Sequence, residues 1–236
     1  MTAPTIVFDL DGTLVDTAPD LIETLNVVFA REGLAPVGFA SARNTIGGGA
    51  RRMIEHGLRF EGHILADAEV DRMLADFLAH YSDHIADLSL PFPGLDAALD
   101  ALDARNHTLA VCTNKLEGLS RQLLGKLGLT DRFAAICGQD TFGIQKPDPE
   151  ILRRTIQAAG GELRTSIMVG DSGTDIATAR AAGIPVVAVD FGYSETPIAT
   201  LGADILIGHF DELGGAIDRL MPATGSGLSR KSHFKP

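Results

Sequence analysis

Two aspartates, Asp9 and Asp11, stand one residue apart near the amino end of the chain, directly after an apolar run at 5–8. The run is rich in β-branched and aromatic residues, which predicts a buried strand. Two carboxylates at the end of a core strand repel each other and need hydrogen bonds or a cation. A divalent metal and a phosphate-binding turn at Gly12 and Thr13 would supply them. The alternative is an Asp-Gly turn that the aspartates only cap.

Further polar residues follow three later apolar runs, each of which is predicted to be a strand. They are Thr113, Asn114 and Lys115 after 108–112, Lys146 in the loop after 134–137, and Asp171 and Asp175 after 166–169. In an open parallel sheet, ligands bind beyond the carboxyl ends of the strands. We therefore expect these acidic, small polar and lysine side chains to meet at one edge of a sheet.

The elements that must position these residues alternate between strand and helix. Besides the runs above, strands are predicted at 186–189 and 205–207, and helices up to residue 127, over 148–159 and over 175–182. This alternation predicts an α/β fold, a doubly wound parallel sheet with helices on both faces. We expect residues 1–15 and 89–222 to form this core, because the first strand shares the apolar texture of the later ones.

Residues 16–88 have a helical texture, which predicts an inserted helical cap domain. One helix is expected to begin with Thr17 as its cap, and a later long helix carries apolar residues over 70–85 on one face. A glycine-rich turn at 47–49 interrupts the helices, and no strand is expected within this insertion. The run 90–94 contains two prolines and a glycine and predicts a stiff connector back to the core.

The composition of the 236-residue chain limits the kinds of partner. Apolar residues make up 45% of the chain. The net charge of −11 argues against non-specific binding to nucleic acid or to an anionic membrane. No apolar run reaches the roughly 20 residues of a membrane span, and the start of the chain lacks a signal-peptide pattern. Cys112 and Cys137 lie in apolar runs, so a cytoplasmic protein is expected. The tail 223–236 is expected to be disordered, and the chain is expected to be a monomer or a homodimer.

The four polar segments resemble, in order, the four sequence motifs of the haloacid dehalogenase superfamily. These segments are Asp9 to Thr13, Val111 to Asn114, Lys146 with Pro147, and Gly170 to Asp175. The resemblance covers nearly the whole chain, because the helical insertion lies where that family carries its smaller type of helical cap. It implies a Rossmann-like core and phosphoryl transfer. Dehalogenases of the superfamily lack the second carboxylate, so the presence of Asp11 favours phosphoester chemistry.

The resemblance also implies a role for each motif residue, and the chemistry of the side chains agrees. Asp9 would be the nucleophile that forms an aspartyl-phosphate, and Asp11 the general acid and then the general base. Lys146 would neutralise charge on the nucleophile and on the transferring group, while Thr113 would hold phosphoryl oxygens. The glycine of the first motif lets the backbone approach the phosphate, and substrate contacts are expected from Gly12, Thr13 and Asn114.

A magnesium ion is the cofactor that the resemblance implies. Its expected ligands are the carboxylates of Asp9 and Asp171 and the backbone carbonyl of Asp11, which suit a hard cation. Asp175 is expected to bind it through water or to support the other ligands.

Two stretches resemble segments of the phosphoglycolate phosphatases of that superfamily, namely 44–51 in the insertion and 190–197 in the core, and so does the block 171–183 around the fourth motif. A small phosphate ester with a carboxylate would be bound by a cap arginine, and Arg51 is expected to bind it, with Arg43 and Arg52 as further candidates. These arginines could instead be solvated residues of the cap surface. The substrate expected is 2-phosphoglycolate. A phosphatase for another small sugar or acid phosphate, a β-phosphoglucomutase-like phosphotransferase and a non-catalytic sensing or protein-binding relative are the alternatives.

Overall fold

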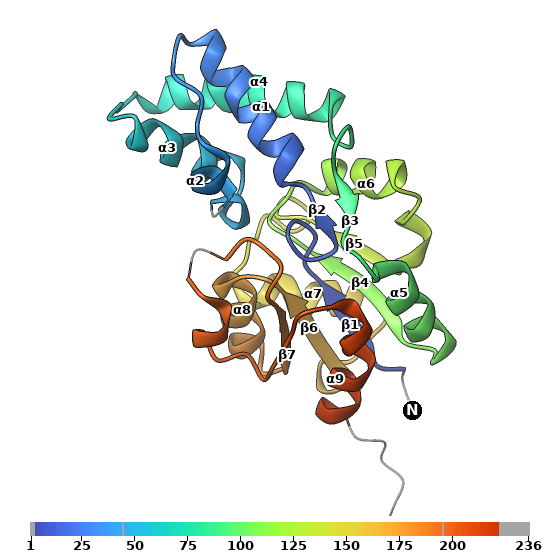
Figure 1. The fold of residues 1–236 in the computed structure, drawn as a ribbon. Helices are drawn as coiled ribbons and strands as arrows, with labels where there is room; N and C mark the ends of the chain where they lie inside the picture. The colour runs from blue at the N-terminus through green and yellow to red at the C-terminus, as the bar shows by residue number, and fades with distance from the viewer. Residues whose placement is uncertain (1–2, 44, 195, 222–236) are drawn as a thin grey trace, which may run out of the picture.

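The computed structural model describes residues 3–43, 45–194 and 196–221, and its centre is a six-stranded sheet (Figure 1). Each neighbouring pair is parallel, in the order β5-β4-β1-β6-β7-β8. The strands are β1 (Thr5–Phe8), β4 (Thr108–Cys112), β5 (Ala135–Cys137), β6 (Ser166–Gly170), β7 (Val186–Val189) and β8 (Ile205–Ile207). Because β1 lies between β4 and β6, the carboxyl ends of these three strands lie side by side.

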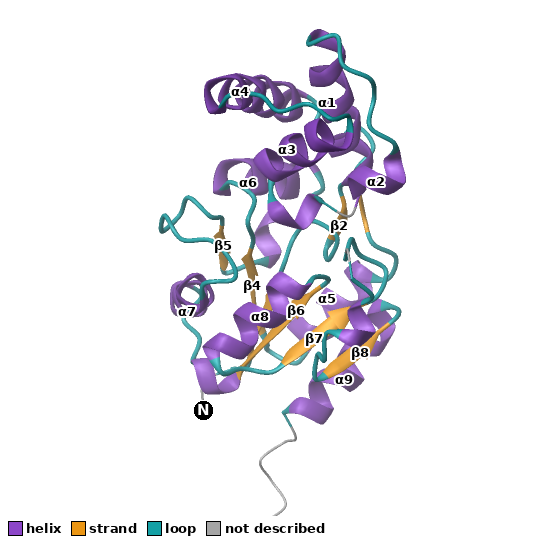
Figure 2. Cartoon of the chain, turned by 90° about the vertical axis from the view of Figure 1, so that its left-hand side faces the viewer, coloured by secondary structure: helices purple, strands orange, loops and turns teal. Residues whose placement is uncertain are grey.

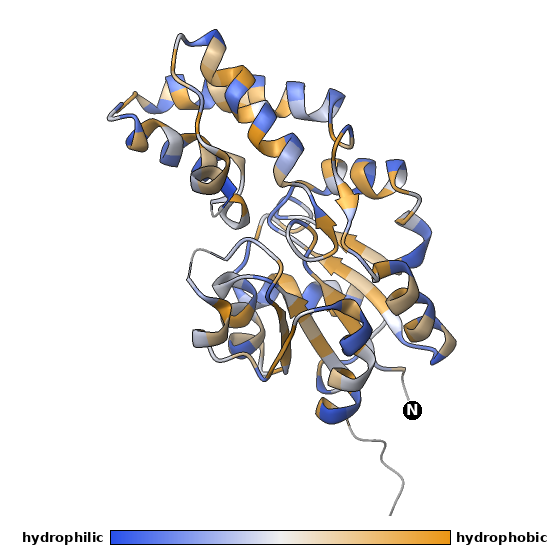
Figure 3. Cartoon of the chain, viewed as in Figure 1, coloured by the Kyte–Doolittle hydropathy of each residue, from blue (hydrophilic) through white to orange (hydrophobic). Residues whose placement is uncertain are grey.

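Helices cover both faces of the sheet, as Figure 2 shows, so the predicted doubly wound α/β fold is confirmed. The side chains of Ile6 and Phe8 share a core with α5 (Leu95–Ala104), α6 (Glu117–Lys126) and α9 (Leu213–Leu220). Val7 points to the opposite face, where α7 (Pro149–Ala158) and α8 (Gly173–Ala182) pack. Alternate residues of a strand point to opposite faces, so both faces of β1 are apolar and buried. The apolar residues of the strands are visible in Figure 3.

A helical segment between β1 and β4 lies beyond the carboxyl ends of the strands (Figure 1). It consists of α1 (Ala18–Arg31), α2 (Phe39–Arg43), the 3₁₀ turn η1 (Ile46–Gly48), α3 (Ala50–Phe60) and α4 (Asp67–Asp83). Its buried side chains include Phe29, Ile54, Met73 and Phe77, which belong to the same apolar cluster as one face of the sheet. The apolar stripe of each helix is therefore buried against its neighbours.

The two chain crossings between the sheet and this helical segment are joined by a short antiparallel ribbon. β2 (Val15–Asp16) pairs with β3 (Leu90–Pro91), with Val15 opposite Pro91. The Asp20 carboxylate on α1 accepts hydrogen bonds from the Ser89 hydroxyl at 2.6 Å and from the backbone N–H groups of Leu88 and Ser89. The first-turn aspartate of α1 therefore holds the returning chain.

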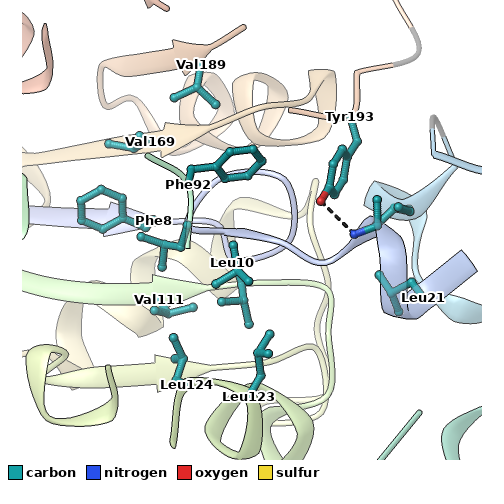
Figure 4. Close-up of a cluster of buried hydrophobic side chains, with 14 of the residues drawn as sticks. Phe8, Leu10, Leu21, Phe92, Val111, Leu123, Leu124, Val169, Val189 and Tyr193 are labelled. Carbon is teal, nitrogen blue, oxygen red and sulfur yellow. Dashed lines mark hydrogen bonds between the residues drawn. The ribbon is translucent and has the colours of Figure 1, made fainter. Parts of the chain in front are cut away.

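Tyr193 joins this crossing to the core. Its hydroxyl accepts a hydrogen bond from the backbone N–H of Ala18 at 3.0 Å (Figure 4) and donates one to Asp16. Figure 4 also shows the neighbouring buried cluster, which contains Phe8, Leu10 and Phe92. A side chain from the loop after β7 thus fixes the start of α1.

Several sequence expectations differ from the structure in detail. Thr17 precedes α1 but makes no capping side-chain hydrogen bond within the described part of the chain, and its hydroxyl is buried. The expected connector 90–94 contributes strand β3, and Asp16, expected in a region without strands, lies in β2. These pairings are only two residues long, which is too short for a periodic signal in the sequence.

Other segments were not expected as helices or lie outside the description. The helices α5 and α9 were not predicted, although α5 repeats leucines at 95, 99 and 102 with helical spacing. The expected disordered tail 223–236 and positions 44 and 195 of the two resembling stretches lie outside the described residues. Among the described residues, no helix has the length and apolar character that crossing a bilayer requires.

Candidate active site

The carboxyl ends of β1, β4 and β6 bring the predicted residues together. Asp9 follows β1 directly, and its backbone N–H donates to the carbonyl of Val169 in β6 at 2.9 Å. Thr113 follows β4 and is held in line with β5 by a hydrogen bond from its N–H to the Cys137 carbonyl at 3.0 Å. The strand registers therefore place these two residues and Asp171 around one point, as expected for an open parallel sheet.

Lys146 is the cation at the base of this arrangement. Its ammonium lies 2.9 Å from Oδ1 of Asp9 and 2.6 Å from Oδ1 of Asp175, and its side chain is 2% exposed. The backbone of Lys146 is fixed by Asn114, whose Oδ1 accepts from the lysine N–H at 2.8 Å and whose Nδ2 donates to its carbonyl at 3.2 Å. Asn114, expected to contact substrate, thus holds the lysine loop against the loop that follows β4.

Asp171 is held on both carboxylate oxygens. The Thr13 hydroxyl donates to Oδ1 at 3.1 Å, and the Tyr193 backbone N–H donates to Oδ2 at 2.6 Å. Gly12, with φ of +81°, passes so close that an added Cβ would lie 2.4 Å from Oδ2 of Asp171. A glycine is required here by both the backbone conformation and the close approach. Thr13, another expected substrate contact, orients Asp171 in this structure.

Asp175 lies at the amino end of α8 and is fully buried. Its Oδ2 accepts from the Ser172 backbone N–H at 3.1 Å and from the Ser172 hydroxyl at 2.6 Å, while Oδ1 faces Lys146. One oxygen each of Asp9, Asp171 and Asp175 lies within 4.8 Å of the others. Three buried carboxylates at this separation fit a single divalent cation, for which oxygen atoms are the preferred ligands.

Burial and the repulsion between the carboxylates shift the pKa values of this cluster. Burial raises the pKa of Asp9 to about 6 against the attraction of Lys146, and Asp175 raises it further. Burial, Asp175 and Asp9 raise the pKa of Asp171 to about 8. Burial would lower the pKa of Lys146, but Asp175 and Asp9 raise it above its usual range, so the lysine stays charged. One lysine does not balance the three carboxylates, and a bound divalent cation would.

Asp11 points to a second lysine. The Lys115 ammonium lies 2.9 and 3.1 Å from the two oxygens of Asp11 and 4.5 Å from the centre of the Tyr81 ring on α4. Burial would lower the pKa of Lys115, but Asp11 and Tyr81 raise it above its usual range. Lys115 lies at the sheet edge where the sequence predicts it, although no role was predicted for it. Its position directly after Thr113 and Asn114 was the available signal.

A pocket of about 480 Å³ lies over these residues, between the sheet edge and the helical segment. Its lining includes Asp9, Asp11, Thr113, Asn114 and Lys115 from the core and Gly47, Arg51, Arg52, Phe77 and Tyr81 from the insertion. The site therefore depends on the insertion as well as on the sheet.

The predicted cap arginines lie in different surroundings. Arg51 lines the pocket, and its guanidinium is paired with Glu55, Asp67 and Asp71. Arg43 donates to the Phe191 carbonyl at 2.9 Å and lies over the Tyr193 ring, away from the pocket lining.

The comparisons with known proteins agree with this geometry. The chain is 49% identical to a protein named phosphoglycolate phosphatase from Mesorhizobium japonicum, over 95% of this chain and 100% of that protein. A protein of the same name from Agrobacterium fabrum is 44% identical, over 95% of this chain and 96% of that protein. The crystal structure of a predicted phosphoglycolate phosphatase from Haemophilus somnus is similar with a TM-score of 0.85 at 27% identity, and the match covers 92% of this chain and 98% of that one. The sequence profile of the haloacid dehalogenase-like hydrolases matches residues 6–189, and the chain belongs to this family.

Proposed function

We propose that this chain hydrolyses small phosphate monoesters through an aspartyl-phosphate on Asp9. The observation that carries the proposal is the buried contact of 2.9 Å between Asp9 and Lys146 beneath a pocket that also exposes Asp11. A carboxylate held by a fixed cation is oriented for attack and keeps its charge when a phosphate approaches. The relatives that are named phosphatases support the same chemistry.

The proposed reaction has two steps. An oxygen of Asp9 attacks phosphorus and the bond to the ester oxygen breaks, while Asp11 gives a proton to the leaving alkoxide. Asp11 then takes a proton from water, whose oxygen attacks phosphorus and releases inorganic phosphate and free Asp9. Lys146 faces the nucleophile in both steps, and Thr113 lines the pocket beside it, where its hydroxyl can hold a phosphoryl oxygen.

We infer that Mg²⁺ is the cofactor, held by the carboxylates of Asp9 and Asp171 and by the backbone carbonyl of Asp11. Asp175 would support it through water, because its two oxygens already face Lys146 and Ser172. When bound, the ion would screen the charge between the nucleophile and the phosphate. The fit rests on the three clustered carboxylates and on the burial and mutual repulsion that raise the pKa of Asp9 and Asp171.

The substrate proposed is 2-phosphoglycolate, hydrolysed to glycolate and phosphate. Two relatives with this activity in their names support it, as do the pocket of about 480 Å³ and the cations Arg51 and Lys115 in its lining. Arg51 stays a predicted substrate contact, together with Gly12, Thr13 and Asn114. Another small sugar or acid phosphate would use the same core residues, and a sugar phosphate as phosphoryl acceptor would make the chain a phosphotransferase.

We also propose the domain division and the cellular setting. Residues 1–15 and 89–222 would form the catalytic core and 16–88 the cap that covers it. The net charge of −11 and the two buried free cysteines support a cytoplasmic enzyme with a small-molecule substrate and without nucleic-acid or membrane partners. A monomer and a homodimer both stay open as predictions.

Phosphate release from a substrate panel, with Mg²⁺ and with a chelator, tests the proposal. The panel holds 2-phosphoglycolate, 3-phosphoglycerate, glucose 1-phosphate, glucose 6-phosphate, nucleoside monophosphates and pyrophosphate. We expect metal-dependent release with the highest kcat/KM for 2-phosphoglycolate. Similar, weak release from every ester would contradict the substrate and keep the chemistry. A folded protein without any release would contradict the hydrolase.

A further inference from the structure

The pocket contains a buried lysine and a buried tyrosine that the reaction outlined above does not use. The side chain of Lys115 is 6% exposed, and its ammonium contacts the Tyr81 ring and the carboxylate of Asp11. Tyr81 is 1% exposed, and its hydroxyl makes no hydrogen bond of ordinary distance and angle with a described residue, although it interacts with the neighbouring Lys115 ammonium. A buried hydroxyl without a partner is costly unless a ligand satisfies it.

We propose that Lys115 and Tyr81 bind the carboxylate of the substrate and so set its selectivity. The proposal rests on the phosphatase function proposed above. Both residues line the pocket that holds Asp9 and Asp11, one from the loop after β4 and the other from α4. The Lys115 ammonium has three N–H donors and already faces the two oxygens of Asp11. Together with the Tyr81 hydroxyl beside it, it forms a donor pair that suits a second carboxylate.

The position of Lys115 relative to Asp11 suits a short substrate. Asp11 must reach the ester oxygen in order to protonate it, and the Lys115 ammonium lies 2.9 Å from the Asp11 carboxylate. In 2-phosphoglycolate the carboxylate carbon is two bonds from that ester oxygen. A carboxylate at this place in the molecule therefore lies within reach of the ammonium when the ester oxygen faces Asp11.

Arg51, the predicted substrate contact of the cap, is a competing candidate for the same task. Its side chain is 37% exposed and is paired with three carboxylates of the insertion, those of Glu55, Asp67 and Asp71. A substrate carboxylate would compete with these pairs and with water, which weakens the interaction. Lys115 is also paired, with the Asp11 carboxylate, but its low solvent exposure strengthens a charge-assisted hydrogen bond. Lys115 is therefore better placed than Arg51 to bind the substrate carboxylate.

The test compares two esters that differ only in the group to be recognised. 2-Phosphoglycolate carries a carboxylate, and 2-hydroxyethyl phosphate has a neutral hydroxymethyl group at that place. The readout is the kcat/KM for 2-phosphoglycolate divided by that for 2-hydroxyethyl phosphate. If a substitution of Lys115 only impairs catalysis by Asp11, both kcat/KM values fall equally and their ratio does not change. We expect Lys115→Met to lower the ratio about 100-fold and Tyr81→Phe to lower it about 10-fold.

Two further variants serve as comparisons. Lys126→Met makes the same substitution at an exposed lysine of α6, outside the pocket, and is expected to leave the ratio unchanged. Arg51→Met is expected to change the ratio less than Lys115→Met does. A ratio that stays at the wild-type value in Lys115→Met, or that falls further in Arg51→Met, would overturn the inference.

The experiment separates this inference from the proposed function. If the wild type prefers a different carboxylated ester, the substrate proposal fails and the pair 3-phosphoglycerate and glycerol 3-phosphate replaces the first pair. If the wild type shows no preference for carboxylated esters, the inference is overturned and the phosphatase can stand. If Lys115→Met does not fold, Tyr81→Phe decides, since it removes one oxygen and keeps the ring beneath the ammonium. An unchanged ratio in that variant rejects the inference.

Discussion

The ammonium of Lys146 lies 2.9 Å from Oδ1 of Asp9, and both side chains are buried. The lysine reaches this place from the loop between β5 and α7, while the aspartate directly follows the central strand β1. Asp175 lies 2.6 Å from the same ammonium, so the cation is shared between two carboxylates. The proposed nucleophile is thus held in position by an ion pair. The negative charge of the clustered carboxylates still exceeds the positive charge of Lys146, which favours the binding of a divalent ion.

Asp9→Asn is expected to abolish turnover and to leave the fold intact. The amide has the shape of the carboxylate but cannot form the aspartyl-phosphate, so we expect kcat to fall at least about 1,000-fold. Phosphate release measures the loss, and circular dichroism with thermal unfolding checks the fold. Removal of one of three clustered carboxylates also relieves repulsion, so the Tm without metal should not fall. Activity above a few per cent of wild type would contradict the covalent mechanism.

The stability of the metal-free protein is expected to fall as the pH rises from about 4 to about 8. The pKa of Asp9 is raised from 3.8 to about 6 and that of Asp171 from 3.8 to about 8. The folded protein therefore holds these protons more tightly than the unfolded chain, and it loses the resulting stabilisation as the pH passes from the unfolded pKa to the folded one.

A divalent cation should reverse this trend, because its binding displaces the same protons. We expect the rise in Tm caused by Mg²⁺ to be larger at pH 8.5 than at pH 6, measured by differential scanning calorimetry. Asp171→Asn removes the group with the higher pKa and a proposed ligand, and serves as the comparison. It should show a smaller metal effect at pH 8.5. A metal effect of equal size at both pH values in the wild type would contradict this account.

Gly12→Ala tests the close approach of the first motif to Asp171. Both Gly12 and Gly33 have positive φ, +81° and +70°, so an alanine at either is strained by about 1–2 kcal/mol. At Gly12 the new Cβ would also lie 2.4 Å from Oδ2 of Asp171, whereas at Gly33 no described atom lies within 4 Å. Urea unfolding should show a loss above about 3 kcal/mol for Gly12→Ala and only the strain for Gly33→Ala. Equal losses would show that the contact with Asp171 is unimportant.

Asp20→Ala is expected to loosen the crossing between the sheet and the insertion. The carboxylate is 3% exposed and accepts hydrogen bonds from Leu88 and Ser89, so its removal leaves buried donors without partners. We expect a loss of about 2–4 kcal/mol in the free energy of unfolding. Asp131→Ala, at an exposed residue, should change it by less than about 0.5 kcal/mol. A loss at Asp20 no larger than at Asp131 would contradict the role of this network.

Much of the core could be predicted from the sequence because its signals are local. The apolar run before Asp9, the runs before Thr113 and Asp171, and the glycine and proline stops each act within a few residues. A parallel sheet places the residues that follow its strands at one edge. The residues after each predicted strand were therefore also the predicted residues of the site. The fold class and the family resemblance were confirmed in this way.

The contacts that complete the pocket were decided only in the tertiary structure. Lys115 meets Tyr81 across 34 positions of sequence, and Tyr193 reaches Ala18 across 175. No helical or strand periodicity, turn or sequence motif links the two residues of either pair. Each contact arises where the inserted helices pack against loops of the sheet. Long-range packing of this kind depends on the summed shape and burial of many side chains. The sequence by itself therefore determined which residues stand at the sheet edge, and the packing of the insertion decided which of its residues face them.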